Sequence, residues 1–111
     1  MSADDRVTTN LRKGVLEFCV LAHIQAGDAY GFELARVLEA DGLIAGEGTL
    51  YPLLTRLRSS GLVETRWVES DAGRPRKYYT LTPVGVAQLE AFQRAWIPLR
   101  DAVDQTMRRS S

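Results

Sequence analysis

Apolar residues recur at helical spacing along residues 11–25, and they form two stripes rather than one. The first stripe contains Leu11, Val15, Phe18 and Ala22, and the second contains Leu16, Val20 and Ile24. An amphipathic surface helix needs only one apolar stripe. Two stripes therefore predict a helix buried between two neighbours, of which one is the core of the chain and the second could be another chain.

Two more helices are predicted before residue 61. Residues 30–40 form the first, and its inward residues are expected to be Phe32, Leu34, Ala35 and Leu38. The second begins near Thr49 with Gly46 as its N-cap, and its apolar positions at i, i+3, i+4 and i+7 are Leu50, Leu53, Leu54 and Leu57. Gly61 is suited to end this helix, because glycine readily adopts the left-handed conformation that follows a helix C-terminus.

The pattern changes after Gly61 from helical spacing to extended runs. Residues 62–70 and 76–82 are rich in β-branched and aromatic residues and flank a Gly/Pro corner, which predicts a β-hairpin. Tyr78 and Tyr79 must point to opposite faces of their strand, so one of them should be core. Thr82 followed by Pro83 predicts the start of a last helix.

The last helix carries an apolar seam with alternating spacings of three and four. The seam contains Leu89, Phe92, Trp96, Leu99, Val103 and Thr106. It is too short to be stable alone, so it needs a partner, within the chain or in a second copy. We expect an isologous homodimer with an interface that contains Leu11, Val15, Phe18, Leu89, Phe92, Trp96, Leu99 and Val103. Pro98 is expected to kink the helix, because it cannot donate to the carbonyl of Arg94.

The predicted fold class is mainly α with a small β-hairpin. Three helices followed by a two-stranded wing define a winged helix-turn-helix, in which the third helix enters a DNA groove. The expected organisation is a flexible N-terminal arm at 1–10, a winged helix-turn-helix DNA-binding domain at 11–82 and a C-terminal dimerisation helix at 83–111.

Charge is distributed unevenly, although 14 Lys/Arg balance 14 Asp/Glu over the 111 residues. Residues 1–46 carry four basic and seven acidic residues, a balance of minus three, whereas residues 55–80 carry six and three, a balance of plus three. Arg74, Arg76 and Lys77 lie together at the predicted hairpin corner, where cations can reach phosphates or a narrow minor groove. Neutrality overall argues against indiscriminate nucleic-acid binding.

No enzymatic chemistry is indicated. Cys19 and His23 share a helix face, but they are the one cysteine and the one histidine of the chain, and zinc usually needs three or four ligands. The sequence contains no phosphate loop, so we expect no catalytic site, no metal and no cofactor. One cysteine, no signal-peptide pattern and no apolar run long enough to span a membrane predict a cytoplasmic protein without membrane contact.

Three motifs resemble the PadR family of bacterial transcriptional regulators. They are "YGFEL" at 30–34, "GTLYPLLTRLRSSGLVE" at 48–64 and "GRPRKYYTLTPVG" at 73–85. The single C-terminal helix is similar to the short subfamily. The resemblance implies a dimer that represses its target genes by binding double-stranded DNA at a pseudo-palindromic operator, in some members with release by a small molecule. It assigns DNA contacts to Thr49, Tyr51, Pro52, Arg56, Arg74, Arg76 and Lys77.

The resemblance also implies a ligand site around Trp96. In multidrug-sensing short members, a tryptophan at the corresponding position comes from both subunits and sandwiches planar ligands. Here the site would be lined by Phe18, Ala22, Leu89, Phe92 and Trp96. Arg100 stands where cation-binding members present an acid, so a planar apolar ligand is expected. The alternative is a small-molecule-binding or protein-interaction module on a winged-helix scaffold, with weak DNA binding.

Overall fold

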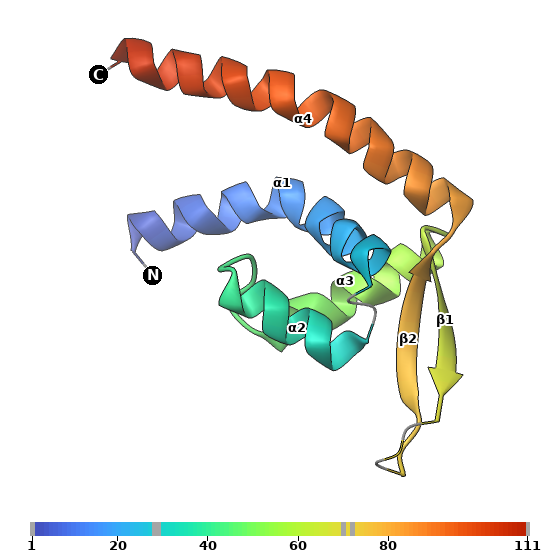
Figure 1. Cartoon of the computed structure of the whole chain (residues 1–111). Helices are drawn as coiled ribbons and strands as arrows, with labels where there is room; N and C mark the ends of the chain where they lie inside the picture. Colours follow the sequence, from blue (N-terminus) through green and yellow to red (C-terminus); the bar gives the residue numbers. More distant parts are fainter. Residues whose placement is uncertain (1, 28–29, 70, 72, 111) are drawn as a thin grey trace.

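The computed structural model describes residues 2–27, 30–69, 71 and 73–110. The elements follow the order α1 (Ala3–Ala26), α2 (Gly31–Ala40), α3 (Glu47–Ser59), β1 (Val63–Val68), β2 (Arg76–Leu81) and α4 (Pro83–Ser110). Figure 1 shows α1, α2 and α3 packed together, the hairpin projecting to one side, and α4 running back above α1. The predicted fold class is confirmed.

The first helix begins at Ala3, so residues 3–10, which were expected to form a flexible arm, are its first turns. The Ser2 hydroxyl caps the helix by accepting the N–H of Asp5 at 3.2 Å. Asp4 and Asp5 lie in the first turn, where the helix dipole favours negative charge. Capping and charge therefore extend the helix beyond the apolar stripes from which its start was predicted.

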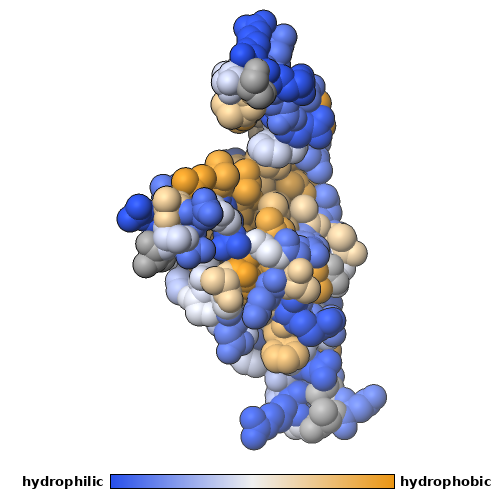
Figure 2. Space-filling model, turned by 90° about the vertical axis from the view of Figure 1, so that its left-hand side faces the viewer, coloured by the Kyte–Doolittle hydropathy of each residue, from blue (hydrophilic) through white to orange (hydrophobic). Residues whose placement is uncertain are grey.

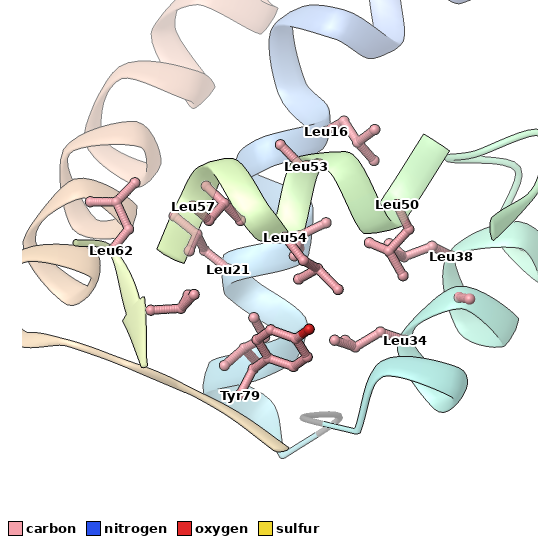
Figure 3. Close-up of a cluster of buried hydrophobic side chains, with 14 of the residues drawn as sticks. Leu16, Leu21, Leu34, Leu38, Leu50, Leu53, Leu54, Leu57, Leu62 and Tyr79 are labelled. Carbon is pink, nitrogen blue, oxygen red and sulfur yellow. The ribbon is translucent and has the colours of Figure 1, made fainter. Parts of the chain in front are cut away.

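Leucines of the three N-terminal helices form the core, as Figure 3 shows for side chains that converge from α1, α2 and α3. The buried hydrophobic residues are Leu16, Val20, Leu21, Ile24, Leu34, Ala35, Leu38, Ile44, Leu50, Leu53, Leu54, Leu57, Leu62, Val63, Tyr79 and Leu89. The prediction was wrong for Phe32, which is 58% exposed. Phe32 lies in the first turn of α2 on the side opposite to Leu34 and Leu38, so the helix turns it away from the core.

The two strands pair antiparallel, with Val63 opposite Leu81 at the base and Val68 opposite Arg76 at the far end. Tyr79 is the core tyrosine, whereas Tyr78 is only partly buried. Tyr30 adds an isolated bridge to Tyr78. The start of α2 is thereby attached to the hairpin, which the sequence pattern did not indicate.

A tight joint connects the hairpin to α4. The Thr82 hydroxyl accepts the N–H of Gly85 at 3.0 Å and donates to the carbonyl of Gly61 at 2.6 Å. Thr82 therefore acts as the N-cap of α4, and the predicted start of the last helix is confirmed. A side chain at position 85 would collide with the carbonyl oxygen of Leu62, so only glycine allows α4 to start this close to β1.

Beyond its first two turns, α4 leaves the core. Its buried residues are Gly85 and Leu89. Phe92 then stacks on Phe18 of α1 with ring centroids 4.4 Å apart, and Trp96 stacks on Phe92 at 5.6 Å. The helix continues through Pro98 to Ser110, and in Figure 1 it diverges from α1 toward the C-terminus.

Candidate nucleic-acid interface

The surface of α3 is divided by its leucine stripe. The four leucines that were predicted to face inward are all buried. The predicted DNA-contacting residues of this helix are all exposed, and they are Thr49, Tyr51, Pro52 and Arg56. Because the core covers the whole leucine stripe, the opposite side of α3 remains free to enter a DNA groove.

One flank of α3 faces β2 across two crevices. Tyr51, Thr55 and Arg58 form this flank, at positions i, i+4 and i+7. A crevice of about 240 Å³ is bordered by Thr55, Arg58 and Lys77, and a second crevice of about 330 Å³ is bordered by Tyr51, Thr55 and Lys77. Thr49 instead borders a smaller crevice of about 160 Å³ against α1.

The sequence predicts that the three basic residues of the hairpin lie together at its corner. The structure shows that they do not all lie at the tip. Arg74 lies in the exposed turn between the strands, whereas Arg76 and Lys77 are partly buried residues of β2. The guanidinium carbon of Arg76 is 4.7 Å from the ring centroid of Tyr30. Lys77 Nζ lies 6.0 Å from the Trp67 ring and 5.9 Å from the Tyr79 ring. Strand alternation thus directs Arg76 toward α2 and Lys77 toward α3.

Tyr51 on this flank and Tyr79 on β2 remain neutral hydrogen-bonding groups near pH 7. Burial is the main cause that raises the pKa of Tyr51, followed by the negative charge of Glu47. Burial also raises the pKa of Tyr79, against a smaller lowering by the positive charge of Arg58. Since both shifts are upward from an ordinary value already far above neutrality, Tyr51 can donate its hydroxyl proton to an acceptor such as a phosphate.

A second surface lies between α1 and α4. Figure 2 shows apolar side chains gathered beneath the C-terminal part of α4, on the face that also includes the start of α1. A groove of about 500 Å³ separates the helices there. Its lining is mostly apolar and includes Leu11, Val15, Trp96, Leu99 and Val103.

The residues predicted for the dimer interface and ligand site are only partly brought together. Phe18, Phe92 and Trp96 form one continuous stack. Leu89 is buried in the core instead, and Ala22 is exposed. Of the five predicted ligand residues, only Trp96 also lines the groove, because α4 diverges from α1 beyond the stack.

Cys19 and His23 show no sign of shared chemistry. Cys19 is packed against the core, and burial raises the pKa of its thiol. His23 Nε2 lies 3.9 Å from a carboxylate oxygen of Asp41. Within the described ranges, no group of three His, Cys, Asp or Glu residues could hold a metal ion. None of the helices that the described residues form has the length and apolarity needed to cross a membrane.

Three helices, an exposed third helix and a basic antiparallel hairpin define a winged helix-turn-helix, a class of DNA-binding fold. The sequence model described as "Transcriptional regulator PadR-like family" matches residues 20–91, more than half of the chain. The chain therefore belongs to the PadR-like family of transcriptional regulators, which are not enzymes.

Individual relatives agree with this assignment. The transcriptional regulator Rv3488 of Mycobacterium tuberculosis is 35% identical over 86 residues, which cover 76% of this chain and 78% of that protein. A PadR-like transcriptional regulator from Bacillus cereus has a TM-score of 0.81 at 37% identity, covering 88% of this chain and 96% of that one. A PadR-like transcription factor from Bacteroides fragilis has a TM-score of 0.72 at 40% identity, covering 91% and 98% respectively.

Proposed function

We propose that this regulator acts in the cytoplasm as a homodimeric repressor that binds a pseudo-palindromic duplex operator. In each protomer α3 enters the major groove and presents Thr49, Tyr51, Pro52 and Arg56, while the hairpin brings Arg74, Arg76 and Lys77 to the backbone or the adjacent minor groove. The observation that carries the proposal is the position of the basic hairpin beside the exposed face of α3 in a chain without net charge.

The unpartnered face of α4 supports the dimer. Leu99 and Val103 are 59% and 49% exposed, and they continue the line of the Phe92–Trp96 stack. A second copy that laid its own α4 along the groove would bury this apolar stripe, and twofold symmetry would present two recognition helices.

The same face supports a ligand-responsive regulator. Trp96 borders the groove with one side of its ring system stacked on Phe92, so a flat apolar molecule could stack in the groove between two protomers. Arg100 also lines the groove, and its positive charge disfavours a cationic ligand.

Fluorescence anisotropy with duplex DNA from upstream of the chain's own gene tests the proposal, with scrambled DNA compared over a salt series. We expect sequence-preferring binding that weakens steeply with salt. Arg74→Ala combined with Arg76→Ala should flatten the salt slope by about 0.9 for each phosphate that the variant no longer neutralises. Arg108→Ala combined with Arg109→Ala removes the same charge at the far end of α4 and should leave the slope unchanged.

Changes on α3 should act on discrimination instead. Arg56→Ala should reduce the preference for the specific duplex if its side chain reaches base edges in the major groove. Feeble, equal binding of the unmodified protein to every duplex would overturn the proposal. A ligand-binding or protein-interaction module on the winged-helix scaffold would then be the better description, and the α1–α4 groove would be its site.

A further inference from the structure

One face of the hairpin carries an exposed tryptophan that has no part in the proposed function. Residues that pair directly across the strands share a face, and the register pairs Trp67 with Lys77 and Thr65 with Tyr79. Tyr79 and Val63 of this face are buried in the core. The face therefore begins against α3 at its base and continues outward to Trp67 beyond the core.

Trp67 is 69% exposed. Its contact with Lys77 is a long cation–π approach of 6.0 Å, which leaves most of the indole in water. A large apolar ring held beside a lysine, on a strand that otherwise projects into solvent, presents a flat apolar surface next to a positive charge.

Arg58 continues this surface onto α3. It borders the crevice of about 240 Å³ that also contacts Lys77. It also borders a wider crevice of about 510 Å³ on the other side, with Val63 and Thr65 of β1. Arg58 of α3 and Lys77 of β2 therefore place positive charge on either side of the space that separates α3 from β2.

A duplex bound as proposed above would place one sugar–phosphate strand in that space. When a helix lies in the major groove and a hairpin reaches the neighbouring minor groove, the strand that divides the two grooves must pass between them. Such a strand alternates anionic phosphates with apolar deoxyribose edges. A surface that lines up cations with a flat apolar ring is complementary to this alternation of phosphates and sugars.

We propose that Arg58, Lys77 and Trp67 form a track for one DNA strand, in which Arg58 and Lys77 bind successive phosphates and the Trp67 indole packs against a deoxyribose. The track rests on the proposed function and adds two residues, Arg58 and Trp67, that the sequence motifs did not assign to DNA. Charge complementarity favours DNA as the occupant of this surface over a second copy of this neutral chain.

The ionic and apolar parts of the track make different contributions to binding, so a salt series separates them. Arg58→Met should weaken duplex binding several-fold and reduce the salt slope by about 0.9. Trp67→Ala should weaken binding about fivefold at every salt concentration and leave the slope unchanged, since it removes no charge. The matched control is Arg66→Met, which removes the same charge from the opposite face of β1 and should change neither quantity. Far-ultraviolet circular dichroism and thermal melting of each variant exclude loss of the fold.

Tryptophan emission provides a readout that a merely structural role would not change. Duplex binding should alter the emission of the unmodified protein, and this change should disappear in Trp67→Phe while anisotropy shows the duplex still bound. Persistence of the whole change in Trp67→Phe, or an effect of Arg66→Met equal to that of Arg58→Met, would overturn the track but leave the proposed function standing. Absence of duplex binding by the unmodified protein at low salt would overturn both.

Discussion

Helices α3 and α4 carry similar apolar stripes, but the two stripes differ in how far they are buried. In α3, four leucines within 13 residues are buried. In α4, 28 residues bury only Gly85 and Leu89, and Leu99 and Val103 remain exposed. An apolar stripe indicates only that a helix needs a partner to cover it. The tertiary structure decides whether that partner belongs to the same chain.

The difference matches the two parts of the proposed function, DNA binding and dimerisation. Because α3 is anchored on one side by the core, its opposite side can be held in a fixed position against DNA. The C-terminal half of α4 has its apolar side uncovered, so its stability and position depend on what covers that side. The proposed response to a ligand would act through this side of α4.

The largest expected effect comes from truncating the buried stripe. Leu54→Ala should lower the free energy of unfolding by about 3 kcal/mol, because it opens a cavity between α3 and its neighbours. Urea unfolding should show this decrease at every protein concentration. Leu99→Ala is the matched control on α4, and at concentrations where the protein is monomeric it should cost less than about 0.5 kcal/mol. Equal decreases at these two positions would show that α4 is as fully supported within one chain as α3.

A smaller effect on folding, with a clear effect on assembly, is expected from a charge in the α4 seam. Val103→Asp should raise the dissociation constant of the dimer about 100-fold, since the interface would bury an unpaired carboxylate. Sedimentation velocity over a concentration series measures this change. Gln105→Asp adds the same charge on the far side of the helix and should leave the dimer intact. A protein that sediments as a monomer throughout, even without substitution, would contradict the dimer.

The smallest effect is expected where the hairpin meets α2. Arg76→Ala removes the guanidinium stacked on Tyr30 and should lower the free energy of unfolding by about 0.5–1 kcal/mol. Thermal melting at low and high salt measures this decrease, and it is compared with that of Arg66→Ala on β1 as the control. A decrease no larger than that of the control would mean that the Tyr30–Tyr78 bridge holds the hairpin without help from Arg76.

Local signals in the sequence were sufficient for most of the elements. The spacing of the four leucines located α3, and Gly61, with φ of 77°, ends it as expected. Thr82 and Pro83 located the start of α4. The sequence pattern missed the first turns of α1, because Ser2, Asp4 and Asp5 stabilise a helix end without forming an apolar stripe.

The candidate site could be predicted only in part. The exposed residues of α3 follow from its periodicity, because the leucines fix which side is buried. The sequence did not point to Arg58, which the proposed track includes, because helical spacing alone does not show which flank faces the hairpin. It did not point to Trp67 either, because a tryptophan in a strand is usually core, and only the register shows that its pair with Lys77 lies beyond the core.

The sequence by itself determined the order of the elements, the family and the identity of most core residues, because these depend on spacing between neighbours along one helix or strand. The tertiary structure decided the directions of Arg76 and Lys77, the nearness of Arg58 to the hairpin and the uncovered face of α4. Those features depend on the angle at which one element meets another. That angle is set by packing between residues far apart in the chain, such as Gly85 against Leu62, which no local pattern contains.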